Sequence, residues 1–186
     1  AINKHYITFL GDVMNIFSQF QTRYELRKQE EYTLEEYLEI CKNDSNAYAS
    51  AAERLLIAIG EPEFVDTSKD PRLSRIFSNK VIKRYEKFSD FYGMEECIEE
   101  IVSFFKHAAQ GLEEKKQIIY LLGPVGGGKS SLAEKLKELM QKVPFYAIKG
   151  SPVNDKPLSL FDIKEDASLL KEDYGIDARY LGSIMS

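Results

Sequence analysis

The stretch that decides the fold is Gln117-Ile118-Ile119-Tyr120-Leu121-Leu122-Gly123-Pro124-Val125-Gly126-Gly127-Gly128-Lys129-Ser130. Its first part is an apolar run between charged residues and a glycine, which is typical of a parallel strand buried on both faces. Its second part matches the pattern G-x-x-x-x-G-K-[ST] at every specified position. Leucines then recur at helical spacing over residues 131–142, and residues 143–148 return to a short strand-like run. The order strand, glycine loop, helix, strand predicts an α/β fold with a P-loop.

The glycines of this loop predict a phosphate-binding function. Glycine accepts positive φ and has no side chain, so successive backbone amides can converge on phosphate oxygens. The next helix adds its free N-terminal amides and the positive end of its dipole. We expect the ligands to be ATP and Mg2+, with Lys129 on the β and γ phosphates and the Ser130 hydroxyl on the metal. The predicted binding residues of the loop are Gly123, Pro124, Val125, Gly126, Gly127, Gly128, Lys129, Ser130 and Ser131, although the Ser131 hydroxyl itself is expected to cap or pack.

A structural alternative exists for the same residues. A glycine-rich turn could simply join a strand to a helix and leave Lys129 as a solvated charge. The motif lies between a buried apolar run and an amphipathic helix, which is the context that confirms a P-loop. The nucleotide-binding interpretation is therefore favoured.

Composition bounds the remaining functions. The chain has 186 residues, 44% of them hydrophobic and 30% charged, as in ordinary soluble globular proteins. Acidic residues outnumber basic ones by 30 to 25, so neither nucleic acid nor an anionic membrane is an expected partner. No run is long enough to span a bilayer. Cys41 and Cys97 are expected to be packing thiols, which fits a reducing cytoplasm.

Three regions are predicted along the chain. Residues 1–13 are expected to derive from cloning or from an upstream segment of a longer chain. Residues 14–90 are expected to form a helical N-terminal region and a connector, with a capping box at Thr33 and Glu36 and a helix that ends at Gly60. The connector covers residues 60–92 and has no sustained periodicity. Residues 91–186 are predicted to form the P-loop domain, which begins with a long amphipathic helix over residues 94–112.

The magnesium shell of a P-loop enzyme usually includes an acid at the end of a second apolar strand. Ser159–Asp162 is the nearest approach, and polar residues rather than a buried run precede it. The acidic residues from Asp155 to Asp173 are instead expected to form a solvated loop. Too few residues follow the P-loop for a complete doubly wound sheet, so the chain is expected to be a truncated part of such a domain.

Longer strings give a family resemblance. They are Tyr48–Leu55, Gly60–Pro62, Pro71–Asn79, Phe91–Glu95, Ala108–Glu113, Gly123–Ser131, Ser151–Asp155, Pro157–Asp162, Tyr174–Gly175 and Arg179–Gly182. Together they closely resemble the PrkA family of bacterial serine protein kinases, over nearly everything after Met14. One departure is the short run Lys149–Ser151, where the family usually has a longer glycine-containing insertion.

The resemblance implies an AAA-type ATPase domain that precedes a kinase-like domain in the full-length family. It implies a serine protein kinase, linked to stress responses and sporulation, with a protein substrate and assembly into homo-oligomers through AAA domains. Members have also been considered ATP-dependent proteases. The segment before the long helix would contact adenine, which carries over onto Phe91, Tyr92, Gly93 and Met94. The resemblance places the Walker B acid, the sensors and the arginine finger beyond Ser186, and the catalytic residues are unknown.

Two alternatives from other classes stay open. A small-molecule P-loop kinase has about this length, but such kinases begin with the P-loop, which here starts only at residue 123. A helical interaction module over residues 14–90 could instead bind another subunit, with the nucleotide as a structural ligand.

Overall fold

The computed structural model describes residues 2–5, 31–124 and 126–182. By their contacts, these residues divide into two compact units, one formed by Ala1–Ser50 with Gln141–Ser186 and the other by Ala51–Met140. We call them unit 1 and unit 2 and describe each by itself. This division follows a different line from the domain boundary expected near residue 90, which stays a prediction. The part of the expected helical N-terminal region that covers residues 14–30 lies outside the described residues.

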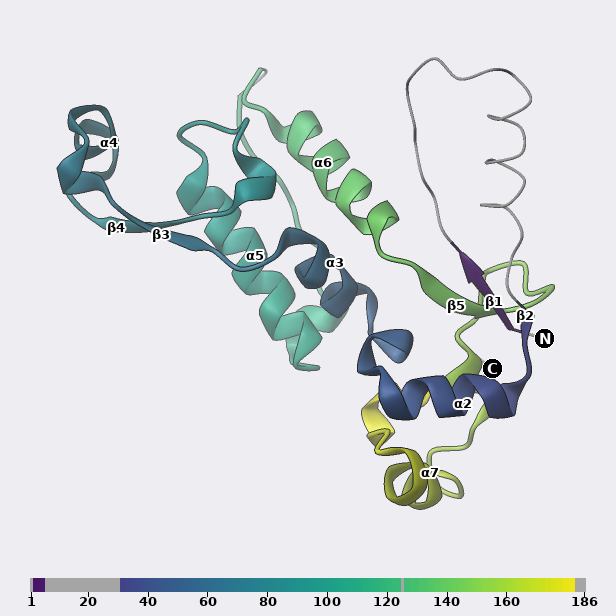
Figure 1. The fold of residues 1–186 in the computed structure, drawn as a ribbon. Helices are drawn as coiled ribbons and strands as arrows, with labels where there is room; N and C mark the ends of the chain where they lie inside the picture. Colours follow the sequence, from purple (N-terminus) through teal and green to yellow (C-terminus); the bar gives the residue numbers. More distant parts are fainter. Residues whose placement is uncertain (1, 6–30, 125, 183–186) are drawn as a thin grey trace, which may run out of the picture. The chain divides into compact units, whose positions relative to one another are not determined.

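Unit 1 combines a small sheet with helices. The sheet has the order β2-β1-β5 and is antiparallel throughout, with β1 (Ile2–His5) between β2 (Glu31–Tyr32) and β5 (Phe145–Ile148). Its helices are α2 (Leu34–Asn43) and α7 (Ala167–Tyr174), together with the single turns Ser45–Tyr48, Pro157–Leu160 and Ala178–Tyr180 (Figure 1). The strand expected over residues 143–148 is confirmed as β5. Its partner is the N-terminal β1.

The capping box of α2 is confirmed. The backbone N–H of Glu36 donates to the Thr33 hydroxyl at 3.2 Å, and the N–H of Thr33 donates to the Glu36 carboxylate at 2.7 Å. These two bonds satisfy donors that the helix itself leaves unpaired. The hydrogen bonds from Thr33 also hold the pKa of Glu36 below its ordinary value.

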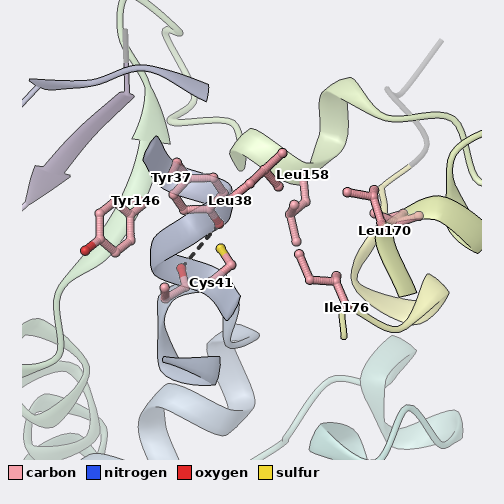
Figure 2. Close-up of a cluster of buried hydrophobic side chains, with 9 residues drawn as sticks. Tyr37, Leu38, Cys41, Tyr146, Leu158, Leu170 and Ile176 are labelled. Carbon is pink, nitrogen blue, oxygen red and sulfur yellow. Dashed lines mark hydrogen bonds between the residues drawn. The ribbon is translucent and has the colours of Figure 1, made fainter. Parts of the chain in front are cut away.

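The core of unit 1 forms between α2, β5 and the C-terminal segments. Tyr37 and Cys41 of α2 are 1% and 2% exposed, and Tyr146 of β5 packs on Tyr37 with ring centroids 5.2 Å apart. The Tyr37 hydroxyl donates to the backbone carbonyl of Ala47 at 3.4 Å. Figure 2 shows these side chains with Leu158, Leu170 and Ile176, which complete the cluster from the C-terminal part of the unit.

Unit 2 is built on helices. Its main elements are α3 (Ala51–Ile59), α5 (Glu95–Ala109) and α6 (Lys129–Lys142), the last of which continues past the unit's end at Met140. The core combines Leu55 and Ile59 of α3 with Val102 of α5 and with Leu132 and Leu139 of α6, each at most 3% exposed. The predicted long helix is thus confirmed as α5. Single turns at Thr67–Lys69, Glu86–Phe88 and Glu113–Lys116 complete the unit.

The connector expected over residues 60–92 is a structured arm. Strands β3 (Glu63–Asp66) and β4 (Val81–Arg84) pair antiparallel, and α4 (Pro71–Phe77) lies between them in the chain (Figure 1). Each strand has only four residues, which is too short for a clear period-two pattern. The pairing therefore leaves little sign in the sequence, which predicted only a connector without sustained periodicity.

The prediction of a buried parallel strand over Gln117–Leu122 is also not met. Residues 117–122 form no strand and pair with no described segment. Ile118, Tyr120 and Leu122 are 90%, 79% and 80% exposed, while Ile119 and Leu121 between them are partly covered. A β-strand requires a hydrogen-bonded neighbour. No described segment pairs with residues 117–122. Their side chains still alternate between exposed and partly buried, as in a strand with one face packed on the protein.

Candidate nucleotide-binding site

The glycine loop runs directly into α6, as predicted. The Gly128 carbonyl accepts from the backbone N–H of Leu132 at 2.8 Å, so the helix begins at the end of the motif. The backbone N–H of Gly127 donates to the Pro124 carbonyl at 3.2 Å and closes a turn inside the loop. The amides of the first helical turn have no acceptor within a helix and carry the positive end of its dipole. They are therefore available to an anion at this end of α6.

Two glycines of the loop hold a backbone conformation that other residues avoid. The φ angles of Gly126 and Gly128 are +81° and +73°. A Cβ atom at Gly128 would lie 3.1 Å from the Met94 sulfur, and one at Gly127 would lie 3.1 Å from the Pro124 carbonyl oxygen. Both distances are tighter than ordinary contacts. The loop thus has the shape of a cradle that side chains at these positions would fill.

The Lys129 ammonium lies against the loop itself. Its Nζ atom donates to the carbonyl oxygens of Gly123 and Pro124 at 2.7 and 2.6 Å. These two carbonyls begin the motif, so the side chain reaches back across the whole loop. Lys129, which was predicted to bind the phosphates, is therefore held at the start of the loop by two backbone carbonyls of the loop itself.

The hydroxyl-bearing residues of the motif lie at the start of α6. Ser130 and Ser131 are both exposed, and Val125 lies outside the described residues. An exposed hydroxyl in the first helical turn could serve as one ligand of a magnesium ion whose other ligands are phosphate oxygens and water. Across residues 2–5, 31–124 and 126–182, no group of three or more His, Cys, Asp or Glu residues is placed to hold a metal ion. That Ser130 is a magnesium ligand stays a prediction.

The segment expected to contact adenine lies next to the loop. Met94 packs its sulfur against Gly128 and stands directly before α5. Phe91 is turned toward the core, with its ring 6.0 Å from that of Phe88. Tyr92 is 87% exposed, and Gly93 follows it. The structure therefore brings the two predicted parts of the site together through Met94, and leaves the Tyr92 ring in solvent.

A groove beside the loop was missed in the sequence. It has a volume of about 560 Å3 and runs between α5 and residues 117–122 as far as Gly127 and Lys129. Glu100 and Lys129 are the charged residues among its described lining. Cys97 also lines it and is exposed, whereas a packing thiol was expected there. The alternating exposure of residues 118–122 is the pattern that creates the groove, and a continuous apolar run in the sequence does not reveal it.

The acidic candidate of the C-terminal region has a local structural role. The Asp162 carboxylate accepts from the backbone N–H of Lys164 at 2.7 Å and from that of Glu165 at 3.4 Å. Asp166 in turn accepts from the N–H of Asp162 at 2.8 Å. These carboxylates cap the turn that leads into α7.

Comparison with known proteins identifies relatives along most of the chain. The model of the PrkA AAA domain matches residues 32–186. The serine/threonine kinase YeaG of Escherichia coli strain K12 is 64% identical over 177 residues, which cover 93% of this chain and 28% of that protein. The ATP-dependent protease PrkA of Bacillus subtilis strain 168 is 33% identical over 161 residues, which cover 82% of this chain and 23% of that protein.

The chain thus spans about a quarter of the length of these relatives. No solved structure matches it significantly. Within the described residues, none of the helices combines the length and the apolar character that crossing a membrane requires.

Proposed function

Since this chain belongs to the PrkA AAA domain family, we propose that its loop from Gly123 to Ser130 is a Walker A motif that binds Mg-ATP. The observation that carries the proposal is the glycine cradle at the N-terminus of α6. Gly128 combines a φ of +73° with the close approach of Met94, so both its backbone and the space around it favour glycine. The first-turn amides of α6 supply donors at the same point.

Each residue of the motif has a role that follows from its position. The loop amides would bind phosphate oxygens, and Lys129 would exchange its two carbonyl partners for the β and γ phosphates. The exposed Ser130 hydroxyl would hold the magnesium ion, which neutralises phosphate charge when it is bound. Ser131 would extend the row of first-turn amides. Tyr92 and Gly93 would contact the adenine, next to the point where Met94 touches the loop.

The parallel sheet of a P-loop fold is part of the same proposal. Ile119 and Leu121 turn toward the unit, and Ile118, Tyr120 and Leu122 are exposed on the other side. A strand with one face packed on the protein and the other face exposed to solvent has this arrangement. We propose that residues 117–122 become the central strand of an AAA sheet when further strands pair with them.

Substitution of Lys129 by alanine tests the site. We expect the variant to lose measurable ATP binding, because it removes the cation of the cradle. Its fold is expected to persist, because the hydrogen bonds of the Lys129 side chain go to carbonyls at the exposed start of the loop. Binding is measured by titration with a fluorescent ATP analogue in the presence of Mg2+, and folding by circular dichroism.

Lys137 provides a matched control on the same helix. Its side chain is 65% exposed and pairs with Glu134 at 3.5 Å, and it stands seven residues beyond Ser130, the last residue of the motif. Lys137→Ala is expected to bind ATP like the parent chain. An unchanged affinity in Lys129→Ala would refute the proposed site.

For the natural protein, the relatives support two activities. The 64% identity to a protein named as a serine/threonine kinase favours a cytoplasmic protein kinase with a protein substrate, in which the AAA domain assembles subunits and gates the reaction. The 33% identity to a protein named as an ATP-dependent protease favours a nucleotide-gated protease. Transfer of labelled phosphate to protein supports the first, and ATP-dependent appearance of peptides without such transfer supports the second.

A further inference from the structure

One face of α4 combines two arginines with an exposed isoleucine. The positions i, i+3 and i+4 of a helix lie on one face. In α4 they are occupied by Arg72, Arg75 and Ile76. All three are exposed, and Ile76 keeps 60% of its surface in solvent. Phe77 is only 5% exposed and anchors the opposite side of α4. We call Arg72, Arg75 and Ile76 the basic face.

The arm holds this face in a fixed position within unit 2. The Thr67 hydroxyl donates to the Lys80 carbonyl at 2.6 Å and closes the arm where α4 begins and ends. The Asp70 carboxylate accepts from the N–H of Arg72 at 2.8 Å and caps α4. The Ser74 hydroxyl bonds the Asn79 side chain at 2.7 Å. The basic face is therefore presented by an internally bonded element.

The charge of the arm is opposite to that of the chain. Residues 67–84 contain six basic residues and one acidic residue, in a chain whose net charge is -5. Four of the six cations have partners inside unit 2, since Lys69 pairs with Asp66, Lys80 with Glu96, Lys83 with Glu99 and Arg84 with Glu63. Arg72 and Arg75 form no ion pair with any residue that the structure describes. Their charges are the unmatched part of the arm.

An acidic face of the same pattern lies on α7 in unit 1. Leu169, Glu172 and Asp173 stand at i, i+3 and i+4 and are all exposed, Leu169 to 60%. Leu170 is 4% exposed and anchors the other side of the helix. Residues 162–177 contain six acidic and two basic residues. Within the described ranges, neither Glu172 nor Asp173 forms an ion pair. We call Leu169, Glu172 and Asp173 the acidic face.

We propose that the basic face of α4 docks on the acidic face of α7 in a second copy of this chain. Each face offers two charges of one sign and one exposed aliphatic side chain at the same helical spacing, so the two surfaces are complementary. A contact between two different surfaces is heterologous, and it continues from copy to copy into a ring or an open chain. Exposed ion pairs are weakened by salt, so the association is salt-sensitive.

Charge reversal tests this contact by sedimentation velocity at low and high salt over a range of protein concentrations. Arg72→Glu with Arg75→Glu reverses the basic face, and Glu172→Arg with Asp173→Arg reverses the acidic face. We expect the parent chain to associate beyond a dimer at low salt, and each double variant to lose at least tenfold in association constant. A mixture of the two double variants restores association, because each reversed face then meets a face of opposite charge.

The reversal Lys106→Glu with Lys137→Glu provides the control, because it changes the net charge equally at exposed sites outside both faces. It is expected to associate more strongly than the double variant of the basic face. An equal loss in the control, or no recovery in the mixture, would overturn the proposal. A parent chain that stays monomeric at every concentration would overturn it too, including the case in which α4 and α7 pair within one molecule. Lys129→Ala is expected to associate normally, so this result is separate from that of the nucleotide site.

Discussion

Gly128 is constrained both by its backbone conformation and by a neighbouring side chain. A substitution by alanine strains the backbone, because φ is +73°, and forces the Met94 sulfur to move, because a Cβ would lie 3.1 Å from it. We expect Gly128→Ala to lower ATP affinity at least tenfold, since the loop amides would no longer converge. Isothermal titration calorimetry with Mg-ATP measures the loss.

Gly111→Ala separates the two effects. Gly111 has a φ of +81°, and no neighbouring atom lies within 4 Å of the place that a Cβ would take there. Alanine at this position therefore costs only backbone strain, of order 1 kcal/mol. Its ATP affinity is expected to be unchanged. Addition of Met94→Ala to Gly128→Ala is expected to recover part of the affinity for tripolyphosphate, which has no adenine for Met94 to contact. If it recovers nothing, the contact with Met94 does not shape the loop.

Cys41 makes stability depend on alkaline pH. Burial raises the pKa of the Cys41 thiol from 9.0 to about 11 and also raises the pKa of Tyr37 above its ordinary value. Between about pH 9 and 11 the unfolded chain releases the thiol proton while the folded chain keeps it. The contribution of the protonated thiol to the free energy of unfolding is therefore complete below pH 9. It is lost as the pH rises through this window, by about 2–3 kcal/mol.

Urea unfolding at several pH values from 8 to 10.5 measures this loss. We expect Cys41→Ala to flatten the pH dependence, although the cavity lowers its stability at every pH. The share from Tyr37 remains in the variant. A parent chain whose stability is constant across the window would contradict the burial of the thiol shown in Figure 2.

At the scale of elements, mutations in α6 should lower the free energy of unfolding much more than mutations in residues 117–122. Leu132 of α6 is 1% exposed and Ile118 is 90% exposed. We expect Leu132→Ala to cost about 2–5 kcal/mol, because it leaves a cavity in the core of unit 2. Ile118→Ser is expected to cost less than about 0.5 kcal/mol, as at other exposed positions. Urea titrations of both variants provide the comparison. A cost at Ile118 close to that at Leu132 would mean that the segment is a buried strand after all.

These elements also explain what the sequence could predict. The helices α2, α5 and α6 were foreseen, because the 3.6-residue spacing of apolar side chains and a capping box are local signals. Strand pairing is not local. The run over residues 117–122 has the composition of a buried strand, yet its burial depends on neighbours elsewhere in the chain. The partner of β5 came from residues 2–5, on which the sequence analysis built nothing.

At the scale of the molecule, most of the candidate site is contiguous in sequence and could therefore be predicted. The loop and the start of α6 follow from one motif, and residues 91–94 follow from the family resemblance. The contact between Met94 and Gly128 and the groove beside Lys129 could not be foreseen, since both depend on how α5 packs beside residues 117–122. The charged face of α4 could not be foreseen either, because residues 60–92 were expected to be a connector without sustained periodicity and no helix was predicted there.

We expect the 186-residue chain to bind ATP and to hydrolyse it negligibly. Hydrolysis requires an acid beside the magnesium ion and the attacking water. The nearest sequence candidate, Asp162, already accepts hydrogen bonds from the amides of Lys164 and Glu165. Phosphate release is measured with Mg2+ and with a chelator, and Lys129→Ala gives the background. Magnesium-dependent release that disappears in Lys129→Ala would contradict this expectation.

The bonds from Lys129 to the carbonyls of Gly123 and Pro124 have a kinetic consequence. A polyphosphate that binds the loop would compete with these two carbonyls for the ammonium group, so its binding would have to displace two hydrogen bonds. A ligand with a single phosphate would form few new contacts in exchange for the two displaced hydrogen bonds. A triphosphate would form more of them. If the loop is the proposed nucleotide site, these two bonds would therefore favour nucleoside triphosphates over inorganic phosphate.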